Sequence, residues 1–226
     1  MVSVLGFDSS GNGCSAAVRR EGRLAARRFA SMARGQAEAL MPMIDAVLRE
    51  AETPVGALDL IAVTTGPGAF TGLRIGLAAA RGLSLASGVP ALGITSFAAV
   101  AAQVTPAERA GRRLIVALDS RREEFFLQVF GADGTPDGEG ARGAPAAARR
   151  FVPAGELLLA GDAAPRLAQA LGERRPRIAA GLGVPDAADV ARLAADCWHP
   201  GLRPPLPRPL YLRAPDTTMP RPGTAR

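Results

Sequence analysis

Two aspartates, each at the end of an apolar run, are the residues of this chain best suited to chemistry. Asp8 follows VLGF and Asp119 follows LIVAL. Apolar runs of this length predict buried strands, so the two carboxylates would lie at equivalent strand ends. Two such carboxylates facing each other across a cleft could hold a hydrated Mg²⁺ ion.

A nucleotide could lie beside this aspartate pair, but the support is weak. Ser9, Gly11 and Gly161 are the candidate contacts, since glycine lets a ligand approach the backbone closely. These turns are poor in the lysine, threonine and glycine pairs that clamp phosphate groups. Each aspartate could equally accept hydrogen bonds from its own turn. We interpret the pair as a degenerate nucleotide site and expect no cofactor.

Other catalytic chemistry finds little support in the residue types. His199 is the only histidine, and the two cysteines, Cys14 and Cys197, are far apart in the sequence, so no metal-ligand spacing can be recognised. A GxSxG motif is missing, and a Ser-His-Asp set would depend on His199, beside a proline-rich stretch. We therefore expect neither a metal site nor a nucleophilic triad.

The composition favours a cytoplasmic protein. The formal charge is +6, but all 27 basic residues are arginines, scattered or paired, so the charge alone does not indicate a polyanion-binding arm. Two cysteines cannot build a disulfide framework, which suggests a reducing compartment. The sequence shows neither a signal-peptide pattern nor an apolar stretch of membrane-spanning length.

A glycine-rich turn is the most distinctive local feature. The apolar residues 60–63 precede the turn GPGAFTG, and a helix is predicted over 73–87. Strand, glycine loop and helix is also the order in which phosphates are held at helix N-termini. The turn matches neither a Walker A sequence nor GxGxxG, so close packing of strand and helix is the simpler interpretation.

Small residues recur at every fourth position along this predicted helix, at Gly72, Gly76, Ala80, Ser84 and Gly88. This spacing places them along one side of the helix. Because a glycine inside a helix costs about 0.5–1 kcal/mol relative to alanine, close approach of another helix or of the sheet is expected to offset it. Packing within the chain and docking of a partner helix are both consistent with the stripe.

The rest of the chain alternates predicted strands and helices in two similar halves. Residues 112–134 repeat the order of parts found at the start of the chain, which we interpret as an internal duplication. Pro42 either starts the first helix or kinks it. Strands are predicted over 2–7, 14–19, 23–30 and 91–94, and helices over 36–51 and 96–103.

The second half is predicted with less regular structure. We expect a flexible connection over 131–155, a strand, turn and helix over 157–171, a helix over 186–198 and a last short strand at 210–213. The expected domains are an N-terminal lobe over 1–105, a C-terminal lobe over 106–213 and a disordered tail over 214–226.

Several segments together resemble one family. The run GPGAFTGLRIGLAAARGLSLASGVPALGITSFAAVAAQ resembles the signature region of the TsaB (YeaZ-type) family of bacterial tRNA threonylcarbamoyladenosine biosynthesis proteins. Ala69 stands where that family usually carries serine. The match is dense over residues 2–130 and thin beyond. Similar in the expected order are also VLGFDSSGNGCSAAV, QAEALMPMID, LIVALDSRREEFFLQVF and LYLR.

This resemblance implies an α/β fold of the actin-like ATPase (ASKHA) class, with two RNase-H-like lobes that each hold a mixed β-sheet flanked by helices. It also implies a role without catalysis. The related TsaD subunit carries a His-x-x-x-His metal pair on the helix after the signature. Ser96 and Val100 stand at the corresponding positions here, and neither can bind the metal.

The partners implied by the resemblance are a TsaD-type paralogue and a TsaE-type ATPase, with tRNA met through the complex and a homodimer formed by the chain alone. Helices of the N-terminal lobe would supply the interface. The interface residues expected from the two helical patterns are Leu40, Met43, Ile44, Val47, Gly72, Leu73, Gly76, Leu77, Ala80 and Ser84.

Two other functions stay open. An autonomous small-molecule kinase or ATPase of the same fold would use Asp8 and Asp119 around Mg-nucleotide. A glycoprotease-type hydrolase has little chemical basis, because the chain offers neither the metal pair nor a triad.

Overall fold

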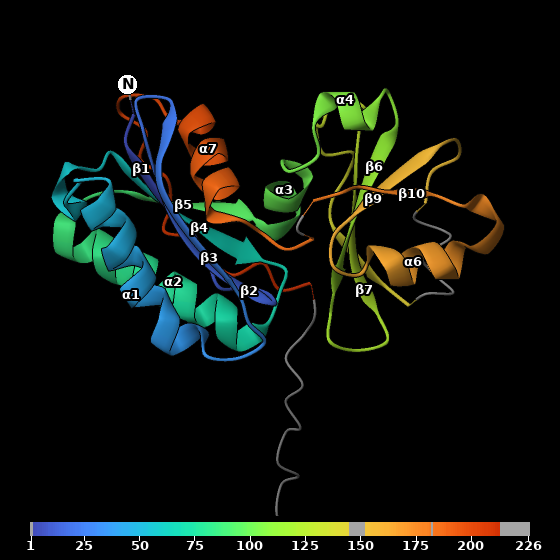
Figure 1. Cartoon of the computed structure of the whole chain (residues 1–226), viewed down its shortest axis with the longest axis horizontal. Coiled ribbons are helices and arrows are strands. Elements are labelled where there is room, and N and C mark those ends of the chain that lie inside the picture. The colour runs from blue at the N-terminus through green and yellow to red at the C-terminus, as the bar shows by residue number, and fades with distance from the viewer. Residues whose placement is uncertain (1, 145–151, 182, 213–226) are drawn as a thin grey trace, which may run out of the picture.

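Two α/β lobes lie side by side in the computed structural model (Figure 1), which describes residues 2–144, 152–181 and 183–212. Each lobe is built on one five-stranded mixed sheet. The strand orders are β3-β2-β1-β4-β5 and β8-β7-β6-β9-β10, so the second sheet repeats the topology of the first. The predicted internal duplication is therefore confirmed at the level of topology.

The first sheet opens with an antiparallel meander of β1, β2 and β3, and then adds β4 and β5 parallel to β1. β1 and β4 are buried along their whole length, as expected of central strands that are covered on both faces. The strands are β1 (Val4–Asp8), β2 (Gly13–Arg20), β3 (Arg23–Ser31), β4 (Leu60–Gly66) and β5 (Ala91–Thr95).

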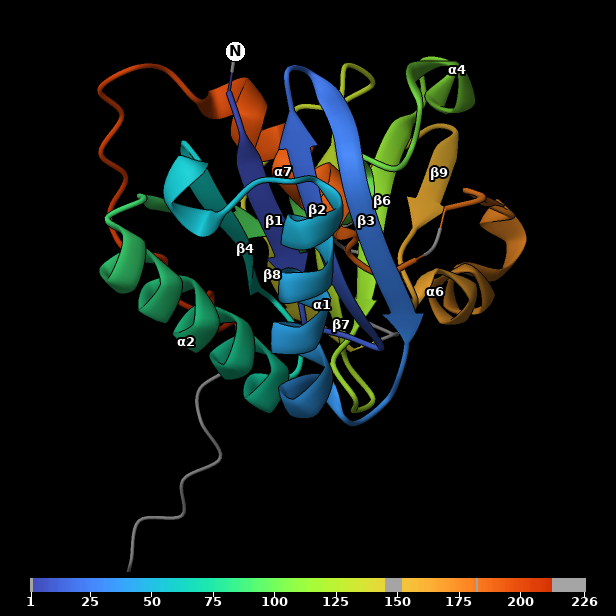
Figure 2. The ribbon, with the colours of Figure 1, turned by 60° about the vertical axis from the view of Figure 1, so that its left-hand side comes forward.

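Helices cover both faces of this sheet (Figures 1 and 2). α1 and α2 pack together on one face and α7 packs on the other. Successive β1 side chains alternate between these layers: Leu5 and Phe7 join the core under α1 and α2, whereas Val4 joins the core under α7. The three helices are α1 (Gln36–Glu50), α2 (Phe70–Ser87) and α7 (Ala187–Cys197).

α7 reaches the first sheet from far along the chain. A Cβ at Gly6 of β1 would lie only 2.6 Å from the carbonyl oxygen of Ala187, so a glycine is needed for the helix to approach this closely. Asp186 caps the helix, and Arg27 of β3 pairs with the same carboxylate. The expected C-terminal lobe, residues 106–213, therefore contains a helix that packs with the other lobe.

The second lobe begins with the antiparallel strands β6, β7 and β8, beside which β9 and β10 run parallel to β6. β8 lies inside the stretch expected to be a flexible connection, so that expectation is wrong for residues 141–143, which pair with β7. The strands are β6 (Arg113–Asp119), β7 (Phe125–Phe130), β8 (Ala141–Gly143), β9 (Leu157–Ala160) and β10 (Arg177–Ile178).

α3 connects the two lobes (Figure 1). Phe97 and Val100 pack against one face of the second sheet, and Ala99 packs into the core under α7. α6 covers the opposite face of the second sheet. The remaining elements are α3 (Ser96–Ala101), α4 (Pro106–Arg109), α6 (Ala164–Leu171) and the 3₁₀ turns η1 (Val55–Ala57) and η2 (Gly172–Arg174).

The described end of the chain returns to the first lobe. The Leu210 N–H donates to the carbonyl of Thr65, and the Arg81 guanidinium on α2 donates to the carbonyl of Pro207. No strand forms over residues 210–212, so the predicted last strand is wrong for the part that the structure describes. The expected tail, 214–226, lies outside the described residues.

Two local predictions need correction. α2 begins at Phe70, three residues before the predicted start, because the last three residues of the predicted glycine turn already belong to the first turn of the helix. Pro42 lies in the interior of α1, so it does not start that helix. None of the described helices is both long and apolar enough to cross a membrane.

Candidate functional site

Asp8 is fully buried where β1 ends. Its Oδ1 accepts hydrogen bonds from the Ser10 N–H (3.0 Å), the Ser10 hydroxyl (2.6 Å) and the Thr64 hydroxyl (2.5 Å). Its Oδ2 has no hydrogen-bond partner among the described residues. Burial raises the pKa of Asp8 from 3.8 to about 6, although the Ser10 and Thr64 hydrogen bonds oppose the shift. The carboxyl group is thus turned into the protein.

Asp119 ends the equivalent strand but contacts other groups. Its Oδ1 accepts from the Arg121 N–H at 2.9 Å and pairs with Arg166 on α6 at 3.0 Å. Its own N–H donates to Asp162. Each of the two aspartates therefore accepts hydrogen bonds from its own neighbours, and the two carboxylates are not arranged around one shared metal ion.

The cleft between the lobes is closed around these strand ends. Only about 20 Å³ of space lies among the residues there, which include Ser10, Gly68, Asp119 and Asp162. Ligand sites in proteins span roughly 300–1,000 Å³, so a nucleotide does not fit. The residues present therefore do not suit the Mg-nucleotide that the alternative function requires.

The candidate glycines and Ser9 serve packing at these strand ends. A Cβ at Gly161 would overlap the carbonyl of Ala117, and a Cβ at Gly68 would overlap the carbonyl of Ser10. Ser9 donates its hydroxyl hydrogen bond to the Gly72 carbonyl at 2.9 Å. Gly11 is the exception, because its nearest neighbour is Val184 at 3.9 Å. The glycine turn is closed by backbone contacts, as the packing interpretation expects.

At the two positions that match the metal-binding histidines of the related subunit, this chain carries side chains that make other contacts. The Ser96 hydroxyl lies 3.2 Å from the Ser10 hydroxyl, and Val100 is buried against the second sheet. His199 is exposed and lies beside the Pro200 carbonyl. Within the described ranges, no group of three or more His, Cys, Asp or Glu side chains could hold a metal ion.

The expected partner-interface residues lie mostly inside the first lobe, so that set is corrected. Their apolar stripes face the sheet, because this is how amphipathic helices bury their apolar sides. Met43 and Ser84 are partly buried, and the Ser84 hydroxyl bonds the Val89 carbonyl. The buried members are Leu40, Ile44, Val47, Gly72, Leu73, Gly76, Leu77 and Ala80.

α1 and α2 lie in front of the first sheet in Figure 2, and their outward face carries other exposed residues. Leu85 is 89% exposed on α2, and Met41 is 46% exposed on α1. Helical periodicity predicts this outward face as well, because it lies opposite the buried apolar stripe.

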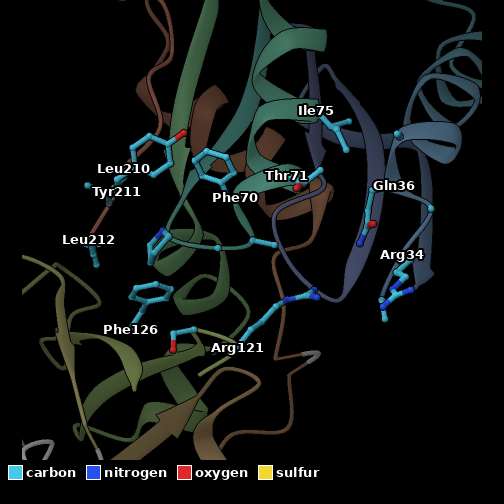
Figure 3. Close-up of a pocket in the computed structure, with 18 of the residues that line it drawn as sticks. Arg34, Gln36, Phe70, Thr71, Ile75, Arg121, Phe126, Leu210, Tyr211 and Leu212 are labelled. Atoms are coloured by element: carbon cyan, nitrogen blue, oxygen red, sulfur yellow. The ribbon is translucent and has the colours of Figure 1, made fainter. Parts of the chain in front are cut away.

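A larger cavity, of about 780 Å³, opens between the N-termini of α1 and α2, the second lobe and the end of the chain (Figure 3). Its wall includes Arg34, Phe70, Arg121, Phe126 and Tyr211. Phe70 lies in the glycine signature, and Arg121, Phe126 and Tyr211 lie in other segments that resemble the family. The resemblance gave none of these four residues a role.

Comparison with known proteins places the chain in a family. A family model described as "TsaD: tRNA N6-adenosine threonylcarbamoyltransferase" matches residues 30–188. The solved structure of YeaZ from Pseudomonas aeruginosa is similar with a TM-score of 0.81 and 30% identity, covering 94% of this chain and 100% of that one. The chain belongs to this family, in its TsaB (YeaZ) branch.

The TsaB protein of Escherichia coli is 28% identical over 130 residues, which are 58% of this chain and 55% of that protein. The chain thus spans about half the length of the curated relatives it matches. The fold extends further than the TsaB sequences: an ADPNP-bound dehydratase activator from Clostridium difficile is similar with a TM-score of 0.50 at 10% identity. That likeness concerns the fold alone, and the expected actin-like ATPase fold is confirmed.

Proposed function

We propose that this chain acts in the synthesis of threonylcarbamoyladenosine in tRNA, as a subunit that activates a TsaD-type threonylcarbamoyltransferase and does not itself catalyse the transfer. Its TsaB (YeaZ) relatives carry this biosynthetic role in their names. The observation that carries the non-catalytic part is the closed cleft. The strand ends that hold Asp8 and Asp119 leave about 20 Å³ between the lobes.

The contacts inside the cleft support the same assignment. Gly68 and Gly72 press the glycine turn onto the Ser9–Ser10 backbone, so opening a nucleotide site would break close packing. Asp8 is turned inward and Asp119 is paired with Arg166. An autonomous kinase would need both carboxylates turned into an open cleft, which weighs against that alternative.

The partners in this proposal are a TsaD-type subunit and a TsaE-type ATPase, with tRNA met inside the assembly in the cytoplasm. We place the contact on the outward face of α1 and α2, defined by Met41 and Leu85. Exposed apolar side chains on neighbouring helices favour association with another helical surface, and methionine adapts to different partners. The same face would serve a homodimer when the chain is alone.

Reconstitution tests the proposal. A TsaD-type and a TsaE-type protein would be assayed for threonylcarbamoylation of tRNA with and without this chain, and the chain would also be assayed alone. Modification that requires the chain, with no turnover by the chain alone, is the expected result. Full modification without the chain, or hydrolysis of Mg-ATP by the isolated chain, would contradict it.

A further inference from the structure

The cavity of about 780 Å³ adjoins the closed cleft, with which it shares wall residues such as Pro67 and Arg121, and it has the size of a ligand site. It lies between the N-termini of α1 and α2, residues 120–121 and 126 of the second lobe, and residues 210–212 (Figure 3). Four segments that are distant in the sequence thus form one hollow, and the hollow has two chemically different ends.

Aromatic and apolar side chains gather at one end. The rings of Phe70 and Tyr211 stack with centroids 5.7 Å apart, and the Arg74 guanidinium lies 3.7 Å from the Phe70 ring centroid. Phe126 also lies at this end (Figure 3). Phe70 is 48% exposed and Tyr211 is 43% exposed, so the stack keeps ring surface that a planar group could cover.

Positive charge gathers at the other end. The exposed Arg34 side chain pairs with no residue that the structure describes, and Arg121 donates to the neutral oxygen of Asn12. The backbone N–H groups that begin α1 are not capped by a side chain, since Gly35 occupies the N-cap. Glu38 is the one acidic residue among those that line the cavity. This end is suited to an anion held by a guanidinium group.

We propose that this cavity binds a nucleotide, with the base against the aromatic end and the phosphate beside Arg34. A planar ring joined to an anion matches both ends at once, whereas an apolar ligand would leave the arginines unused and inorganic phosphate would leave the rings unused. The nucleotide is either free or part of a single-stranded RNA, because both offer the same chemistry. The proposal concerns the isolated chain and does not depend on its proposed partners.

Calorimetric titration of the full chain tests it, with AMP, a short single-stranded oligoribonucleotide and inorganic phosphate as separate probes. The cavity variants are Arg34→Glu and Tyr211→Ala. Arg20→Glu, an exposed arginine at the β2–β3 turn, and Leu85→Ala are matched controls outside the cavity. Thermal melting of each variant checks that the fold is kept.

Saturable binding of AMP or of the oligoribonucleotide is expected. Arg34→Glu should weaken it at least tenfold and Tyr211→Ala roughly fivefold or more, the loss typical for removing one stacked ring, while both controls stay within about twofold. AMP binding identifies a free nucleotide, and binding of the oligoribonucleotide alone identifies RNA. The proposal is overturned if neither probe binds, if phosphate binds as tightly as AMP, or if the cavity variants bind like the controls.

Discussion

Ser9 and Gly72 are joined twice: the Ser9 hydroxyl donates to the Gly72 carbonyl at 2.9 Å, and the Ser9 carbonyl lies where a Cβ on Gly72 would stand. The first turn of α2 is therefore packed onto the end of β1 through backbone atoms. This contact explains why glycine recurs on the buried side of the helix. The stripe that suggested a docking surface is an internal contact.

The stability of the first lobe should depend on this contact. Gly72→Ala is expected to lower the free energy of unfolding by at least about 2 kcal/mol, since the overlap involves backbone that cannot turn aside. Gly82→Ala is the matched control on the same helix, because a Cβ there meets nothing within 4 Å. It should stabilise the chain by about 0.5–1 kcal/mol. Urea unfolding measures both, and equal effects would refute the packing argument.

Partner binding should depend on the opposite side of the helices. Leu85→Glu is expected to reduce co-purification with a TsaD-type subunit at least tenfold while leaving the melting temperature unchanged, because Leu85 is 89% exposed. Ile178→Glu is a control on the second lobe, where Ile178 is 48% exposed. Unchanged complex formation by Leu85→Glu would remove this face from the proposal.

Asp8 should make stability depend on pH. Its pKa is about 6 in the folded protein, against 3.8 for an unperturbed group, so the folded state holds this proton more tightly than the unfolded chain does. The free energy of unfolding therefore falls as the pH rises between these two values, and the loss is complete above them.

Replacing Asp8 by asparagine removes this pH-dependent contribution to the free energy of unfolding. Asp8→Asn should be more stable than the parent by about 1–2 kcal/mol near pH 7.5, and the difference should shrink as the pH falls toward about 4. The gain in stability stays below the free energy that corresponds to the full pKa shift, because the amide of the new asparagine is a buried donor without an acceptor. Urea unfolding across this range checks it, with the exposed Asp196→Asn as control. A destabilised variant at neutral pH would contradict the expectation.

α7 should depend on Asp186 for its place on the first sheet. This carboxylate is 3% exposed, accepts the Ala188 N–H at 2.8 Å and pairs with Arg27 of β3. Asp186→Ala should cost about 3 kcal/mol, since it removes a helix cap and leaves Arg27 unpaired. Asp45→Ala breaks the exposed pair with Arg49 and should cost less than about 1 kcal/mol. Thermal unfolding of both variants compares them, and equal losses would refute a special role for Asp186.

Sequence patterns alone were sufficient to predict most of the helices and strands and the two-lobed repeat. Buried strands such as Val4–Asp8 and Leu60–Gly66 are recognisable because both faces of a central strand must be apolar. The helix over 36–50 follows from the 3.6-residue period. The family was recognisable from the glycine signature, since those glycines are needed for close backbone contacts.

Only the tertiary structure determined which neighbours the residues of these patterns contact. A stripe of small residues records that something approaches closely but not whether it is a strand of the same chain or a partner, and here it is Ser9 and Val63. The closure of the cleft depends on how two lobes meet, as does the cavity at Phe70, Phe126 and Tyr211. Periodicity describes neighbours along one element, whereas such sites join side chains from distant segments, so only the packed chain determines them.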